Sequence, residues 1–118
     1  MNSDVWRQSE FEAELLYDAT LACRVIQTFL NDLPNALAAI HAAFAQGQFD
    51  TLAKAVHYLH GSAAQLQLAA LVQHCRTLHQ QASAQSLDHS QLQQLMDAAE
   101  QAQQYLSRYL ATSGYQAQ

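Results

Sequence analysis

Residues 67–83 read QLAALVQHCRTLHQQAS, and the apolar positions within this stretch decide the fold class. They recur at alternating steps of three and four residues: Leu68, Leu71, Cys75, Leu78 and Ala82. Because an α-helix has about 3.6 residues per turn, this spacing gathers the apolar side chains on one stripe of a helix. Alternation of this kind is typical of helices that pack together in bundles. The stretch therefore predicts one amphipathic helix of a helical bundle.

The same periodicity predicts two helices in the first 46 residues. A short one spans about residues 9–17, where Ser9 and Glu12 have the spacing of a capping box. A long one spans about residues 18–46 and contains Pro34, which should bend or interrupt it.

Two more helices complete the expected set. One begins near Asp50, which has the side chain of an N-cap, and the last begins at Asp88 or Ser90 and continues to Leu110. Three glycines and one proline leave little material for the turns of a β fold. We therefore expect an all-α single domain over residues 1–118: an antiparallel up-and-down four-helix bundle with an additional short N-terminal helix.

Charge and hydropathy exclude several classes of function. The net charge is −5 and no basic cluster is present, which argues against nucleic acid as a partner. The longest uncharged run, LPNALAAIHAAFAQGQF, has its apolar residues on one stripe, so it is not expected to span a membrane. The N-terminus has no apolar secretory segment, which predicts a cytoplasmic location. Cys23 and Cys75 lie on apolar stripes and should be buried, reduced thiols.

Residues 57–62, HYLHGS, raise the question of function. The helical pattern runs through them although a glycine inside a helix costs about 1 kcal/mol relative to alanine. His57 falls opposite the core stripe of its helix, and Gly61, Ser62 and Ala64 leave little bulk beside it. An exposed neutral imidazole is a suitable phosphoryl acceptor. The alternative is an ordinary surface histidine beside a glycine kept for packing, and the pattern leaves both open.

The wider run AKAVHYLHGSAAQLQLAALVQHCRTLHQQA, residues 53–82, resembles the signature of histidine-containing phosphotransfer (HPt) domains, H-x-[LF]-K-G-[SA] followed by an apolar helix. The upstream run VIQTFLNDLPNALAAIHAAFAQGQFDTLAKAVH resembles the family's Phe, Leu-Pro and A-x-x-x-x-D pattern. The resemblance covers residues 18–82 and implies a motif-bearing core of about 18–112.

This resemblance implies roles for individual residues. His57 matches the phosphorylated histidine, whose attacking atom is usually Nε2 when Nδ1 is engaged elsewhere. Gly61 and Ser62 match the small positions that let a receiver domain dock, and Tyr58 and Ala64 lie beside them as docking residues.

Three positions depart from the family pattern. The usual lysine is replaced by His60, a usual small residue by Gln67, and the usual Glu or Gln of the next helix by His79. We expect His60 to be a weaker, pH-dependent substitute for the lysine, with Lys54 supplying part of the missing charge. His79 could accept a hydrogen bond from His57 or cap the core.

The implied function is that of a phosphorelay intermediate in two-component signalling. It would take a phosphoryl group from an aspartyl phosphate on one receiver domain and pass it to another response regulator. The expected partners are the receiver domains of a response regulator and of a hybrid sensor histidine kinase. No independent enzymatic activity and no cofactor are expected, because the receiver domains supply Mg²⁺, and the protein should be a monomer.

Two alternatives stay open. One is an HPt-like docking or adaptor protein that binds a receiver or kinase without accepting phosphate, as the lost lysine would allow. The other is a metal-binding bundle in which the histidines of several helices converge: His41, His57, His60, His74 and His79. The Glu-x-x-His spacing of bundle di-metal sites is absent, so no metal is expected.

Overall fold

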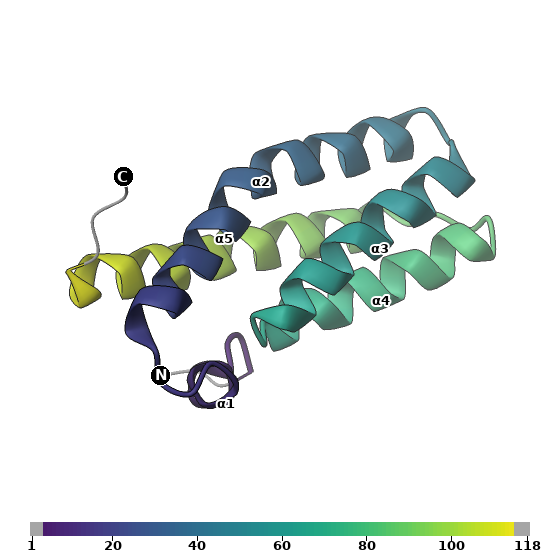
Figure 1. The fold of residues 1–118 in the computed structure, drawn as a ribbon. Helices are drawn as coiled ribbons and strands as arrows, with labels where there is room; N and C mark the ends of the chain where they lie inside the picture. Colours follow the sequence, from purple (N-terminus) through teal and green to yellow (C-terminus); the bar gives the residue numbers. More distant parts are fainter. Residues whose placement is uncertain (1–3, 115–118) are drawn as a thin grey trace.

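The computed structural model describes residues 4–114, which contain α-helices and no strand. Figure 1 shows a bundle of four long helices, with a fifth, short helix near its N-terminal end. The helices, in chain order, are α1 (Gln8–Glu14), α2 (Ala19–Ala45), α3 (Phe49–Gln65), α4 (Ala69–Ser83) and α5 (His89–Ser113). The all-α prediction and the expected arrangement are therefore confirmed.

The four long helices form a closed ring of neighbours. Helix α3 packs against α2 and α4, and α5 completes the ring by packing against α4 and α2. Short turns connect successive helices, so neighbours in sequence run antiparallel (Figure 1). In the described part of the chain no helix is long and apolar enough to cross a bilayer.

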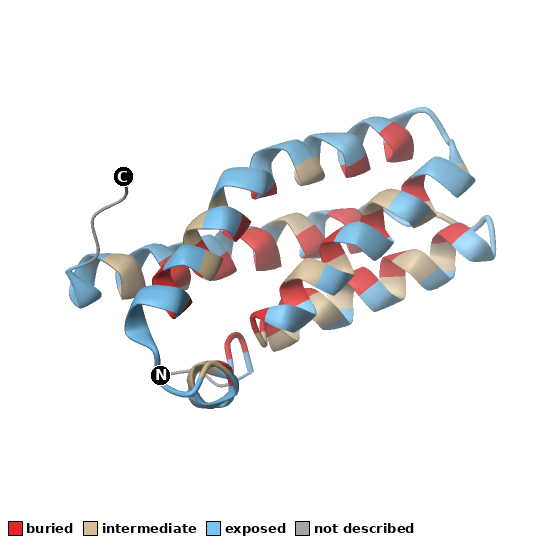
Figure 2. Cartoon of the chain, viewed as in Figure 1, coloured by how far each residue is buried: buried red, intermediate tan, exposed pale blue. Residues whose placement is uncertain are grey.

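Apolar stripes of all four long helices meet inside the ring. The stripe that decides the fold class is wholly buried, as Figure 2 shows for the inward faces of the bundle. On α3 the buried positions are Leu52, Val56, Leu59 and Ala63. Removing apolar area from water contributes roughly 25 cal/mol per Å², which is why these stripes fix the rotation of each helix about its axis.

Two of the expected helix starts are confirmed by their capping bonds. The backbone N–H of Leu21 donates to the Asp18 carboxylate at 3.0 Å, at the start of α2. At the start of α5 the backbone N–H of Ser90 donates to the Asp88 carboxylate at 2.9 Å. Each bond satisfies one of the donors that a helix N-terminus leaves free. Asp88 is thus the cap of α5, and Ser90 lies inside its first turn.

Two other helices begin within one residue of the predicted starts, but their predicted caps are wrong. Helix α1 begins at Gln8, so Ser9 lies within the helix, and the Arg7 N-cap has no side-chain capping bond. Helix α3 begins at Phe49 with Gln48 as N-cap, which places Asp50 in the first turn. A carboxylate there still favours the helix, because the N-terminus carries partial positive charge.

Pro34 lies inside α2, which continues through it to Ala45. The expected interruption is therefore wrong. The ribbon changes direction partway along α2, in agreement with the alternative of a bend (Figure 1). Proline lacks the N–H that would bond the carbonyl one turn earlier, and its ring crowds that carbonyl.

The segment before α1 is attached to the turn between α3 and α4. The indole Nε1 of Trp6 donates to the Leu66 carbonyl at 2.8 Å, and the Arg7 N–H donates to the Gln67 carbonyl at 2.9 Å. Gln67 has a left-handed backbone, φ 63°, and its side-chain amide donates to Glu14. The departure from the family's small residue at this position thus coincides with a contact to α1.

Candidate functional site

His57 lies near the middle of α3 and its side chain is exposed. Residues on both sides of it in the sequence belong to the buried stripe, since Val56 and Leu59 are almost inaccessible to solvent. At about 100° per residue, burial of those neighbours forces His57 to the outside of the bundle. The structure confirms the predicted exposure and places the imidazole on a rigid element.

Three histidines gather where α3 faces α4. The ring centroids of His57 and His60 are 6.4 Å apart and nearly parallel, at 19°. The His79 ring, from α4, lies 6.1 Å from that of His57 at 52°. A cavity of about 230 Å³ joins them, which we call the histidine cavity; it is lined by His57, His60, Cys75, Arg76, His79 and Gln80.

His60 is held in its neutral form. Its pKa is lowered from 6.5, first because burial disfavours the charged ring, then because the Arg76 guanidinium repels that charge, and then through electrostatic interaction with the rings of His57 and His79. Its Nε2 atom is buried without a hydrogen-bond partner in the described chain. Before phosphorylation, the lowered pKa thus favours the neutral form of His60, unlike the lysine whose position it occupies.

His79 is half-buried beside His57, and no hydrogen bond joins the two rings in the described structure. Of the two alternatives for His79, the hydrogen bond from His57 is thus not present among the described residues. His79 lies at the edge of the α3–α4 seam, one residue beyond the buried Leu78.

The gap beside His57 has no packing explanation. A Cβ added at Gly61 would meet nothing within 4 Å, so the glycine is not needed for close approach inside this chain. Ala64 is exposed one turn further on, and Ser62 turns its hydroxyl back to donate to the Tyr58 carbonyl at 3.3 Å. These residues leave a low, open surface next to the imidazole.

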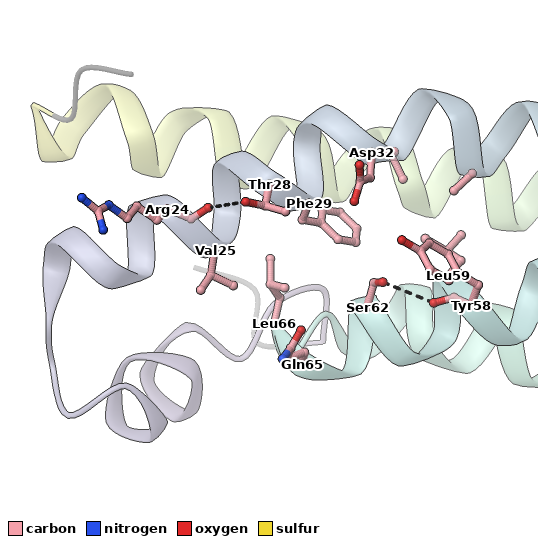
Figure 3. A pocket seen from close by; sticks show the side chains of 12 residues that line it. Arg24, Val25, Thr28, Phe29, Asp32, Tyr58, Leu59, Ser62, Gln65 and Leu66 are labelled. Carbon is pink, nitrogen blue, oxygen red and sulfur yellow. Dashed lines mark hydrogen bonds between the residues drawn. The ribbon is translucent and has the colours of Figure 1, made fainter. Parts of the chain in front are cut away.

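On the other side of α3, a groove separates it from α2. Figure 3 shows Tyr58, Leu59 and Leu66 facing Val25 and Phe29 across this groove. It has a volume of about 250 Å³, and Tyr58 is 60% exposed at its edge. We call it the apolar groove, although Asp32 and Arg24 stand at its margin (Figure 3).

The sequence did not point to Arg76, whereas apolar residues of the long second helix were expected beside the partner. Arg76 precedes His79 by three residues on α4 and lines the histidine cavity. The three-residue spacing of Arg76 and His79 can be read from the sequence. Only the structure shows that this face of α4 packs against the part of α3 that carries His57. Lys54 is exposed on α3, yet it does not line this cavity.

The remaining histidines and Cys23 lie apart from the site, whereas Cys75 lines the histidine cavity from α4. His74 shares a hydrogen bond of 3.1 Å with Gln91 of α5, and within residues 4–114 no three His, Cys, Asp or Glu side chains form a group that could hold a metal. Cys23 and Cys75 are free and buried, as predicted. Burial raises the pKa of Cys75 to about 12, so its thiol is unreactive at neutral pH.

Comparison with known proteins supplies the family. The sequence model of the Hpt domain matches residues 24–105, which is more than half of the chain. The chain therefore belongs to the Hpt domain family. Its role is that of a histidine phosphotransfer domain in two-component phosphorelays, and such domains interact with receiver domains.

The fold agrees with this family. The chain is similar to the HPT domain of the Hpt sensor hybrid histidine kinase from Shewanella, with a TM-score of 0.82 and 16% identity. The match covers 94% of this chain and 97% of that one. A comparison with curated proteins gave no match.

Proposed function

We propose that His57 accepts a phosphoryl group from an aspartyl phosphate on one receiver domain and passes it to another response regulator. One observation carries this assignment: His57 is exposed on a rigid helix, at the border of the histidine cavity and beside the open surface at Gly61. Exposure and low bulk are what in-line attack on a partner's phosphorus requires.

The transfer is a substitution at phosphorus. The Nε2 lone pair of neutral His57 forms an N–P bond as the bond from phosphorus to the aspartate oxygen breaks. The aspartate leaves as a carboxylate, and the proton on Nδ1 stays on the ring or passes to water. The reverse substitution on a second receiver domain regenerates the imidazole.

We propose that the receiver domains bring Mg²⁺ and most of the charge that stabilises the transferring group. This chain contributes the nucleophile and a preorganised position for it, without independent enzymatic activity or a cofactor of its own. The open surface at Gly61, Ser62 and Ala64 is the proposed contact for the receiver, and Tyr58 extends it toward the apolar groove.

The test is transfer from a phosphorylated receiver domain to the wild-type protein and to His57→Gln, read by intact mass and acid lability. We expect one acid-labile, alkali-stable phosphoryl group on the wild type and none on the variant. Circular dichroism of the variant is the control, because the exposed side chain should not affect folding. Labelling of His57→Gln at the wild-type level would exclude the assignment.

A second candidate is a docking protein that binds a receiver domain without accepting phosphate. The lowered pKa of His60 favours it, because the cation that the family places there is missing in the resting protein. Absence of label on the wild type, together with intact receiver binding, would select this candidate.

We further propose that residues 1–118 form one domain that acts as a cytoplasmic monomer without nucleic acid, membrane or metal partners. The net charge of −5 supports the exclusion of nucleic acid. Light scattering at micromolar concentration tests the oligomeric state, and a dimer mass would contradict this part of the proposal.

A further inference from the structure

We propose that Arg76 is the cation that binds the phosphoryl group on His57, which rests on the proposed role of His57 as acceptor. The histidine cavity contains both residues, one from α3 and one from α4. Arg76 would thus serve from the neighbouring helix where the family usually uses a lysine on the same helix as the histidine.

The antiparallel packing of α3 and α4 places Arg76 opposite the turn that follows His57. His79 lies directly across from His57, with ring centroids 6.1 Å apart. One turn back along α4 is Arg76, and one turn forward along α3 is His60, so these two residues face each other. Arg76 also lines an adjoining cavity with Ala64, the next exposed turn of α3.

No other permanent cation lines the histidine cavity. The chain has five Lys and Arg residues in total, all of them in the described range. Arg24 borders the apolar groove, Arg108 lies 6.0 Å from the Tyr105 ring on α5, and Arg7 and Lys54 do not line the cavity. The lowered pKa of His60 favours its neutral form in the resting protein. Arg76 therefore supplies the permanent positive charge at the histidine cavity.

The guanidinium suits this role. It stays protonated at every physiological pH and presents N–H donors in a planar fork that matches phosphate oxygens. Within residues 4–114, no carboxylate forms an ion pair with Arg76, so its donors can turn to a phosphoryl group without breaking one. A phosphoryl group on His57 would enter the same cavity carrying up to two negative charges.

The first experiment measures how phosphoryl groups distribute between a receiver domain and this protein at equilibrium. We expect Arg76→Gln to shift the distribution toward the receiver by about two- to fivefold, the range for one partly exposed charge pair. Arg76→Lys should keep part of the effect, and Arg108→Gln, which removes the same charge from α5, should match the wild type.

A second experiment measures the effect of Arg76 on the phosphoryl group in the absence of a receiver domain. Phosphorus NMR of the isolated phosphorylated protein follows the phosphoryl resonance as pH changes. A neighbouring cation lowers the phosphoryl pKa, so Arg76→Gln should raise it relative to the wild type and to Arg108→Gln.

The outcomes separate the two proposals. If Arg76→Gln is labelled like the wild type and shows the same distribution and phosphoryl pKa, the role of Arg76 is wrong while that of His57 stands. If the wild type is not labelled at all, the acceptor assignment fails first.

Discussion

The two sides of α3 differ in chemistry although they belong to one helix. Toward α4, His57 and His60 meet Arg76 and His79 around a cavity that is lined by titratable side chains. Toward α2, Tyr58 and Leu59 meet Phe29 across an apolar groove. Each residue of a helix is turned about 100° from the one before, so neighbours in sequence can serve different faces. The difference suggests that the phosphoryl group is stabilised on one side and the partner is held on the other.

Gly61 lies on the exposed surface between these two sides of α3. A bulky substitution there should have the largest effect on transfer. Gly61→Leu should reduce the rate of transfer from a receiver domain at least about tenfold, because a bulky side chain would occupy the space where the partner approaches. A tenfold reduction corresponds to an increase of roughly 1.4 kcal/mol in the activation free energy. Transfer kinetics with a phosphorylated receiver measure this. The fold should be intact by circular dichroism, since the added Cβ meets nothing within 4 Å. Unchanged transfer would remove the docking role from this surface.

Tyr58 tests the side that faces α2. Tyr58→Ala should weaken receiver binding by about 1 kcal/mol, the range for truncating an aromatic contact at an interface, while leaving the phosphoryl pKa of His57 unchanged. Isothermal titration calorimetry with the receiver measures the first quantity and phosphorus NMR the second. Tyr17→Ala is the matched control, because Tyr17 is an exposed tyrosine on the α1–α2 turn. An equal loss in both variants would show that the groove has no special role.

Gly61→Ala separates docking from stability. Alanine should raise the free energy of unfolding by about 0.5–1 kcal/mol, because mid-helix glycine is the less favourable residue and the structure gives the methyl group open space. Urea denaturation measures the change. A decrease would mean that the glycine serves the fold, which would contradict a gap kept for a partner.

His60 gives the smallest expected effect, on the side that faces α4. The pKa of His60 is lowered in the folded protein. Below about pH 6.5 the unfolded chain therefore binds more protons than the folded protein does. The free energy of unfolding should therefore fall through that window, and it should fall less in His60→Gln. Denaturation at pH 7.5, 6.5 and 5.5 checks this, and parallel curves for both proteins would contradict it.

Hydrophobic periodicity predicted the helices and their burial, because a stripe fixes both the element and its rotation. Leu71 and Leu78 of α4 and Val56 of α3 are all buried as their spacing required. The starts of α2 and α5 were also predictable, because an aspartate just before a helix is a local capping signal that does not depend on tertiary contacts.

Other features depended on tertiary structure. The capping box at Ser9 failed, and the chain enters α1 from a segment that bonds the α3–α4 turn through Trp6 and Arg7. The helical spacing placed His57 opposite the core stripe, but it could not show which α4 residues face α3. Arg76 was missed for that reason. The lowered pKa of His60 likewise required knowledge of its burial and of three neighbours on two helices.

The most direct test is to locate the phosphoryl group itself. The wild-type protein is phosphorylated by a receiver domain, digested at alkaline pH and analysed by tandem mass spectrometry. We expect a single phosphoramidate on His57, the exposed ring that borders the cavity shared with Arg76. A phosphoryl group on His60 or His79 in place of His57 would contradict it.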